Sequence, residues 1–286
     1  MIAPDPGRAA ASGQSVVGTG GDRAVLRLFC FHQAGGTASM FARWQEALGD
    51  DVDVRPVQLP GRETRVRETV AREMRALVAD LDRELDSQLR APHVLYGHSM
   101  GALVAHALVR RRLTRAAPAP ACLVVGAARA PHLPVVLAEA TALSDVELGR
   151  ELVRFGGMSA MMLRYPDWLA AAVALVRADL RVCLSDRPRD LVRLPCPIHA
   201  FAGAGDPLVG LDEILAWRAH TAAEFTVREL PGGHFFTRDG HEELMVGLRD
   251  LLAPLARSAA GQDEPARSDS WAPSARSGHP FGAGTA

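Results

Sequence analysis

The sequence predicts an α/β fold with a mostly parallel central sheet, helices on both faces and a helical insertion. Three observations support this. Apolar runs typical of strands alternate with helical patterns, as in parallel sheets whose strands are joined by helices. One such run, residues 94–96, leads into Gly97-His98-Ser99-Met100-Gly101 and then a helical pattern, which indicates a tight strand–turn–helix unit. Residues from about 129 to 189 are helical in pattern without a strand, which indicates an insertion.

Length and composition limit the number of domains and the kinds of partner. The 286 residues, 48% hydrophobic and 23% charged, suit one large globular domain or two small ones. A net charge of -1 gives no reason to expect a nucleic-acid or anionic-membrane partner. No apolar run is long enough to span a membrane, and the N-terminus lacks the pattern of a signal peptide, so we expect a cytoplasmic protein.

The two ends differ from the middle. Residues 1–22 and 257–286 are rich in Gly, Ala, Ser and Pro without periodicity and are expected to be disordered, which leaves a folded domain over 23–256. Four scattered cysteines, three of them in apolar runs, are expected to be buried free thiols in a reducing compartment.

Each element of the predicted sheet domain has its own signal. The second strand ends at Pro60-Gly61, and the following helix carries one apolar stripe of helical period: Val70, Met74, Leu77, Val78, Leu81 and Leu85. Prolines 118 and 120 mark the loop before the fourth strand. The expected strands are 25–31, 52–59, 94–96, 122–126, 198–202 and 225–230, and the expected helices are 39–48, about 70–85, 101–112, 212–220 and 242–255.

The insertion is expected to hold two helices and to form a lid. Ser144 and Glu147 form a capping-box pattern, so one helix starts there. Gly156-Gly157 ends that helix or acts as a hinge of a mobile lid, and both interpretations stay open. A second helix over 167–183 has Trp168, Ala172, Leu175 and Val176 on one face. Eight apolar residues either line an adaptable cleft or pack the lid on the sheet: Leu133, Val135, Val136, Leu137, Met158, Met161, Met162 and Leu163.

Ser99 is the candidate nucleophile. The two glycines that flank it in Gly-x-Ser-x-Gly allow a sharp turn that lifts the serine hydroxyl above the sheet edge. The helix that follows points its N-terminal N–H groups at the same place, where they favour developing negative charge.

A serine nucleophile needs a base, and His234 is the candidate. It follows the last strand in Gly232-Gly233-His234, and the order Ser, Asp, His along the chain fits a nucleophile elbow. His98, beside the serine, is expected to point away from its hydroxyl and to pack or support.

Asp206 is the candidate acid that orients the histidine. It lies in Gly205-Asp206-Pro207, just past the strand at 198–202. The competing position, at the end of the strand at 122–126, holds Ala127, Ala128 and Arg129 and no acid. A carboxylate at the end of the fifth strand is placed to accept the Nδ1 proton of His234.

An oxyanion hole needs two N–H donors. One is expected from Met100, the residue after the nucleophile, and the other from the loop His32-Gln33-Ala34-Gly35-Gly36, where Gln33 is favoured and Ala34 is the alternative.

Together these motifs resemble the type II thioesterases of polyketide and non-ribosomal peptide biosynthesis, which have the α/β-hydrolase fold. The matching segments cover nearly the whole folded part and include insertion motifs; His32 departs from the family, which usually has proline there. Besides the loop after the first strand and the three triad motifs, they are Leu59-Pro60-Gly61-Arg62, Arg129-Ala130-Pro131-His132, Leu143-Ser144-Asp145, Phe155-Gly156-Gly157 and Arg177-Ala178-Asp179-Leu180.

The resemblance implies a stand-alone thioesterase that hydrolyses aberrant or stalled acyl groups from the phosphopantetheine arm of an acyl or peptidyl carrier protein. The residues alone support acyl hydrolysis through an acyl-enzyme, without metal or cofactor, by what is expected to be a monomer. Two alternatives stay open: a carboxylesterase or lipase acting on small oxygen esters, and a non-catalytic binding protein.

Overall fold

The structure is a computed structural model that describes residues 25–186 and 191–261. The expectation of disorder over 1–22 and over most of 257–286 lies outside the described residues. The last helix continues to Ala259, so the expectation of disorder is wrong for residues 257–259.

Six strands form one sheet in the order β2-β1-β3-β4-β5-β6, and every neighbouring pair is parallel. The predicted α/β fold with a mostly parallel sheet is confirmed. The strands are β1 (Leu26–Phe31), β2 (Val52–Val57), β3 (His93–His98), β4 (Leu123–Gly126), β5 (Ile198–Gly203) and β6 (Phe225–Leu230).

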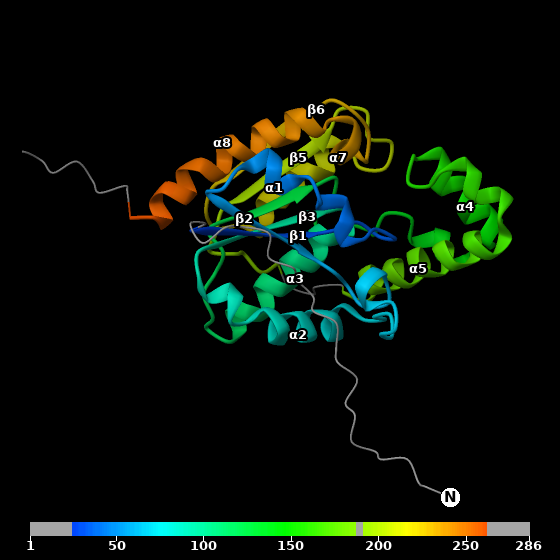
Figure 1. Cartoon of the computed structure of the whole chain (residues 1–286), viewed down its shortest axis with the longest axis horizontal. Coiled ribbons are helices and arrows are strands. Elements are labelled where there is room, and N and C mark those ends of the chain that lie inside the picture. The colour runs from blue at the N-terminus through cyan, green and yellow to red at the C-terminus, as the bar shows by residue number, and fades with distance from the viewer. Residues whose placement is uncertain (1–24, 187–190, 262–286) are drawn as a thin grey trace, which may run out of the picture.

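Helices cover both faces of the sheet (Figure 1). The helices α2 and α3 pack on one face, and α1 and α8 pack on the other, so the sheet separates two apolar cores. Every residue of β3 and β4 is buried, which explains why these strands are continuous apolar runs rather than alternating ones. All four cysteines are free and buried, as expected.

The helices follow the predicted order with shifted ends. The predicted helix from about 70 begins at Met74, and Val70 instead packs in a loop against Gly61. The segments 39–48 and 212–220 each divide into a short α-helix and a 3-10 helix. The bounds are α1 (Trp44–Leu48), α2 (Met74–Leu85), α3 (Met100–Thr114), α4 (Asp145–Arg154), α5 (Pro166–Ser185), α6 (Leu211–Leu215), α7 (Phe236–Asp239) and α8 (His241–Ala259), with 3-10 helices η1 (Ala38–Phe41), η2 (Glu63–Arg65), η3 (Gln88–Arg90), η4 (Ala138–Ala142), η5 (Ala160–Arg164) and η6 (Ala216–His220).

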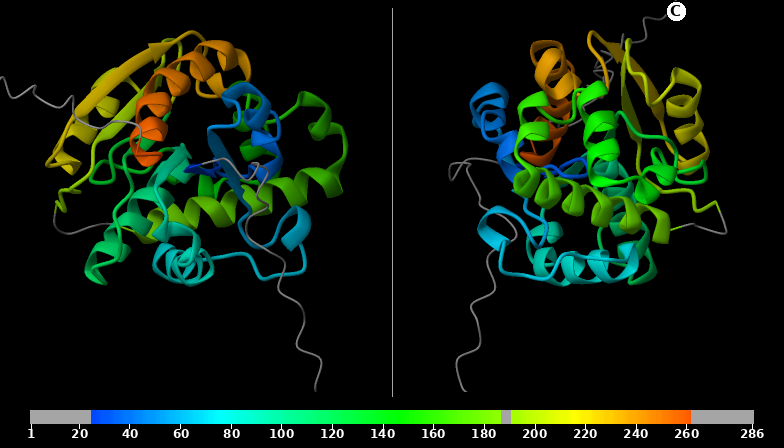
Figure 2. Two further views of the ribbon diagram at one scale, coloured as in Figure 1. Left: turned by 60° about the vertical axis from the view of Figure 1, so that its left-hand side comes forward. Right: turned by 90° about the vertical axis from the view of Figure 1, so that its right-hand side faces the viewer.

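The insertion between β4 and β5 contains η4, α4, η5 and α5 and lies at one end of the molecule (Figure 1; Figure 2, right). It has a small apolar core of its own, to which α5 contributes Leu169, Val173, Val176 and Leu180. Val176 is buried as the predicted face requires, but Leu169 and Val173 replace the predicted Trp168 and Ala172, and Trp168 is 63% exposed. Ser144 and Glu147 form the predicted capping box at the start of α4.

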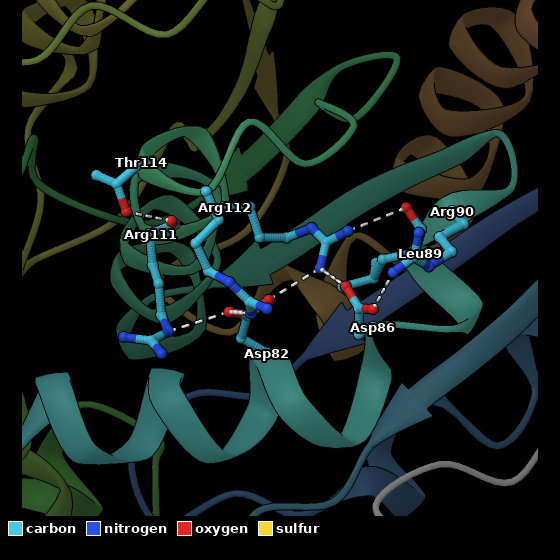
Figure 3. Close-up of polar contacts among 8 residues, drawn as sticks. Asp82, Asp86, Leu89, Arg90, Arg111, Arg112 and Thr114 are labelled. Carbon is cyan, nitrogen blue, oxygen red and sulfur yellow. Dashed lines mark hydrogen bonds and ion pairs between the residues drawn. The ribbon is translucent and has the colours of Figure 1, made fainter.

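A buried cluster of charges joins α2 to α3 (Figure 3). The Asp82 carboxylate is fully buried and accepts hydrogen bonds from Arg112 Nη1 at 2.8 Å and Arg111 Nε at 3.1 Å, and Arg115 also pairs with it. Arg112 Nη1 also bonds to Asp86 at 3.0 Å. Burial raises the pKa of Asp82, but the hydrogen bonds from Arg115 and Arg112 outweigh it and leave the pKa below its usual value.

Within the ranges 25–186 and 191–261, none of the helices combines the length and the apolar character needed to cross a bilayer.

Candidate active site

Ser99 lies between β3 and α3 with a strained backbone, at φ 53° and ψ -117°. Both flanking glycines are required by close approach. A Cβ on Gly97 would lie 2.3 Å from the Gly101 carbonyl carbon, and one on Gly101 would lie 2.1 Å from the Phe31 oxygen. The turn is therefore the sharp elbow that the motif predicts.

The structure brings together the three side chains predicted from distant segments. His234 Nε2 lies 3.1 Å from Ser99 Oγ, and His234 Nδ1 lies 2.8 Å from Asp206 Oδ2. The sequence separations are 135 and 28 residues. The arrangement is a continuous hydrogen-bonded chain from hydroxyl to imidazole to carboxylate, the geometry in which a histidine activates a serine.

Asp206 is held on both oxygens. Its side chain is fully buried, and Oδ1 accepts from the backbone N–H groups of Leu208 at 2.8 Å and Val209 at 3.1 Å. Oδ2 is left to face His234, whose side chain is 4% exposed. The carboxylate therefore has one orientation, and it fixes the proton of His234 on Nδ1, since a carboxylate only accepts.

His98 supports the backbone of His234. Its Nε2 donates to the backbone oxygen of His234 at 2.8 Å, because a carbonyl oxygen accepts only. Its Nδ1 is then the acceptor for the Tyr96 hydroxyl at 3.2 Å. Burial lowers the pKa of His98 to about 3, so the ring stays neutral and keeps this tautomer. The expectation that His98 points away from the serine hydroxyl matches these contacts.

The proposed oxyanion donors lie on two sides of Ser99. Met100 is the first residue of α3, so its N–H has no carbonyl one turn earlier to bond with. Gln33 and Ala34 follow β1 and line the pocket next to Ser99. His32 supports this loop, because its Nδ1 donates to the Gln33 oxygen at 2.9 Å. Burial lowers the pKa of His32 to about 4.

Two apolar pockets meet at Ser99. The first pocket is lined by residues 133–136, Met74 and Cys183 among others, and the second is lined by residues of the insertion and by His234. Among the eight apolar candidates, four line one or both of these pockets: Leu133, Val135, Val136 and Leu137. The other four do not line them: Met158 and Leu163 pack in the core of the insertion, Met161 is 57% exposed, and Met162 is half-buried.

The glycine pair in the insertion ends α4. Gly156 has φ +80°, its N–H bonds to Val153 O at 3.0 Å, and the N–H of Gly157 bonds to Leu152 O at 2.8 Å. This is the hydrogen-bond pattern of a Schellman motif. The glycines therefore have a helix-ending role, and the hinge interpretation stays an untested prediction.

Arg62 and Asp179 contact the loop that supplies a proposed oxyanion donor, a contact that the sequence did not predict. Both belong to motifs that carry the family resemblance, but 117 residues separate them, and no local pattern pairs them. In the structure they form a buried ion pair directly behind the loop of residues 32–36.

Comparison with known proteins identifies the family of the chain. The thioesterase domain model matches residues 26–251, most of the chain. The chain belongs to this family. The gramicidin S biosynthesis protein GrsT of Aneurinibacillus migulanus is 33% identical over 235 residues, which cover 81% of this chain and 92% of GrsT. Thioesterase PikA5 of Streptomyces venezuelae is 32% identical over 230 residues, 80% of this chain and 81% of PikA5.

Solved structures of thioesterases agree. RedJ, a thioesterase of the prodiginine pathway in Streptomyces coelicolor, is 38% identical with a TM-score of 0.74 over 79% of this chain and 85% of RedJ. The type II thioesterase BorB from the borrelidin cluster is 30% identical with a TM-score of 0.74 over 87% of this chain and all of BorB. The predicted resemblance to type II thioesterases and the α/β-hydrolase fold are confirmed, and the thioesterase is a serine hydrolase by family.

Proposed function

We propose that this thioesterase hydrolyses acyl groups from the phosphopantetheine arm of an acyl or peptidyl carrier protein, using Ser99, His234 and Asp206. The observation that carries the proposal is the hydrogen-bonded chain of these three side chains at the junction of two apolar pockets. A thioester carries an acyl chain on one side of its carbon–sulfur bond and the pantetheine arm on the other. A nucleophile at the junction of two pockets can therefore receive both groups.

In the first half-reaction, Ser99 Oγ attacks the thioester carbonyl carbon while His234 Nε2 takes the hydroxyl proton. The carbonyl oxygen becomes an oxyanion that accepts from the amides of Met100 and Gln33. Asp206 stabilises the imidazolium that forms. When the carbon–sulfur bond breaks, the proton on Nε2 passes to the leaving sulfur, which departs as the pantetheine thiol.

In the second half-reaction, a water molecule replaces the thiol. His234 Nε2 accepts a proton from this water as its oxygen attacks the acyl-enzyme carbonyl. The same two amides hold the second oxyanion. Collapse breaks the bond to Ser99 Oγ, which regains its proton from His234, and releases the carboxylic acid.

The two pockets have different roles in this scheme. The leaving sulfur must lie beside the group that protonates it, and His234 lines the second pocket but not the first. The pantetheine arm therefore enters through the second pocket, between Phe155 of the insertion and Phe235. The acyl chain occupies the first pocket, whose lining includes Met74 and Cys183.

The biological role follows from the relatives and stays part of the proposal. Several relatives are named for the gramicidin S, prodiginine and borrelidin pathways, which supports a stand-alone thioesterase that clears aberrant or stalled acyl groups from carrier proteins. Four buried free thiols suit a reducing compartment, which supports a cytoplasmic enzyme. The proposal requires only a monomer, since all three side chains come from one chain.

The test compares three substrates with the same acyl group: octanoyl-phosphopantetheine carrier protein, octanoyl-N-acetylcysteamine and p-nitrophenyl octanoate. We expect kcat/KM to be highest for the carrier protein, and Ser99→Ala to lower kcat by at least about 10⁴-fold on all three. Labelling by a fluorophosphonate should be lost in the same variant.

Each other result would support one of the alternatives. A higher kcat/KM on the oxygen ester than on both thioesters would indicate the carboxylesterase alternative. Carrier-protein binding without turnover would indicate a non-catalytic binding protein. Full activity of Ser99→Ala, with wild-type folding by circular dichroism, would place the site elsewhere.

A further inference from the structure

A buried ion pair joins the insertion to the sheet domain behind the active site. The side chains of Arg62 and Asp179 are each 3% exposed. Arg62 Nη1 donates to Asp179 Oδ2, and Nη2 donates to Oδ1, both at 2.8 Å, which is the two-pronged geometry that binds most specifically. Asp179 belongs to α5, and Arg62 lies in the loop after β2.

The same carboxylate binds the loop that follows β1. Asp179 Oδ2 accepts from the backbone N–H of Gly35 at 2.8 Å, and Arg62 Nη1 donates to the backbone oxygen of Gly36 at 3.3 Å. Gly35 is two residues after Gln33, the proposed oxyanion donor. The pair therefore holds one end of this loop through both a donor and an acceptor of its backbone.

Packing against α5 also restricts the conformation of the loop of residues 32–36. Gly35 has φ +70°, and a Cβ there would lie 2.5 Å from Cγ2 of Val176, one turn before Asp179 on α5. Val176 of α5 therefore packs against Gly35, the same residue whose N–H Asp179 binds. At the far end of α5, Ser185 Oγ accepts from the N–H of Met74 at 2.8 Å, which fastens the helix to α2.

We propose that Asp179, charge-paired with Arg62, is a positioning residue that sets the place of the Gln33 amide in the oxyanion hole. This inference rests on the proposed function, since it assigns a support to one of its oxyanion donors. It also gives the insertion a supporting role in the site, because Asp179 and Ser185 join α5 to the sheet domain at two points.

The charge is necessary for this role. A neutral side chain at position 179 leaves the Arg62 guanidinium buried without a counter-ion, and a buried unpaired cation draws in water or moves its loop. Because the Gly35 N–H then loses its anionic acceptor, the loop is free to shift. A shift of the order of 1 Å at an oxyanion donor lowers a rate by up to about 10²-fold.

The experiment measures Asp179→Asn with octanoyl-N-acetylcysteamine, with rates normalised to folded protein by near-UV circular dichroism. We expect kcat to fall by about 10- to 100-fold while KM changes less than about threefold, because the donor binds the transition state more than the substrate. Octylboronic acid forms a tetrahedral adduct with Ser99, so its Ki should rise by a similar factor.

Asp82→Asn is the matched control. Asp82 is equally buried and arginine-paired but lies between α2 and α3, so its kcat per folded molecule should match wild type within about twofold. The double variant Arg62→Met/Asp179→Leu removes both charges and should recover the thermal stability lost in Asp179→Asn. Its kcat should stay low, because the Gly35 N–H still lacks an acceptor.

The outcomes separate two failures. If wild type hydrolyses the thioester with Ser99 required, but Asp179→Asn keeps its kcat and its boronate Ki, the positioning role is wrong. Recovery of kcat in the double variant would also overturn it, since the pair would then act through stability alone. If wild type does not hydrolyse the thioester, the proposed function fails instead. Should Asp179→Asn not fold, the double variant decides.

Discussion

Two buried aspartates of this thioesterase invite comparison, because each is paired with arginine and each is almost without solvent contact. Asp82 is 0% exposed and its partner Arg112 is 2% exposed; Asp179 and Arg62 are each 3% exposed. Asp82 joins two helices close in sequence and binds arginine side chains (Figure 3). Asp179 accepts from the backbone N–H of Gly35, 144 residues away, in the loop that holds the proposed oxyanion donor Gln33.

The difference shows that burial and ion pairing do not by themselves indicate function. A buried ion pair gains little net stability over apolar packing, although breaking one is costly. What distinguishes Asp179 is its second partner, the main-chain N–H of Gly35, which lies in the loop that supplies a proposed oxyanion donor. Asp206 combines the same features, since it binds two main-chain N–H groups and also His234.

The largest expected effect belongs to Asp206, which contacts the proposed base directly. Asp206→Asn should lower kcat by about 10⁴-fold, because asparagine can donate to Nδ1 and so favours the wrong tautomer of His234. The measurement is single-turnover hydrolysis of octanoyl-N-acetylcysteamine, with thermal unfolding as the folding control. A wild-type rate in this variant would remove Asp206 from the proposed triad. It would also contradict the link between main-chain partners of a buried aspartate and function.

A large effect of a different kind is expected at Asp82. Asp82→Asn should lower the free energy of unfolding by about 3–5 kcal/mol, since it leaves Arg112 buried without its main counter-ion. The depressed pKa of Asp82 means that the folded state favours the ionised form, so this stability is present above the usual pKa and is lost as the pH falls through the lower, folded-state pKa.

Urea unfolding at pH 7 and at pH 3 tests this prediction. The gap between wild type and Asp82→Asn should be wide at pH 7 and narrower at pH 3. An equal gap at both pH values would contradict the charge-based account, and a loss of kcat at pH 7 per folded molecule would remove the distinction between the two aspartates.

The smallest effect concerns the buried side chain of His106. Neither ring nitrogen of His106 has a hydrogen-bond partner among the described residues, and the ring packs against Trp217 and His220. Burial and the nearby His220 hold the pKa of His106 well below its usual value. His106→Leu should therefore raise the free energy of unfolding at pH 7.5 by about 1 kcal/mol, because it removes an unsatisfied polar group.

The same variant should change the response to acid. A histidine with a lowered folded-state pKa binds protons more readily when unfolded, so wild type loses stability as the pH falls below about 6.5. Without His106 this loss should be shallower, as measured by thermal unfolding from pH 7.5 to 4.5. A steeper loss, or a stability drop above 2 kcal/mol at pH 7.5, would show that His106 has a partner or packing role that its contacts do not reveal.

The candidate site was predictable where its chemistry depends on local sequence. Gly97 and Gly101 surround Ser99 because the turn has no room for a side chain, so the motif carries its own steric reason. Asp206 and His234 each follow a strand, and the carboxyl ends of parallel strands meet at one edge of a sheet. The ends of helices were less predictable: Val70 continues the apolar period of α2 but packs in a loop against Gly61.

By itself, the sequence determined the parallel α/β sheet, the elbow and the order of its three candidate catalytic residues, because these depend on periodicity and turn chemistry over a few residues. Only the tertiary structure decided the buried face of α5, the exclusion of the four C-terminal apolar candidates of the insertion from the two pockets, and the pairing of Asp179 with Arg62 and Gly35. The physical reason is range: an ion pair across 117 residues forms only when packing brings its elements together, and no local pattern encodes that contact.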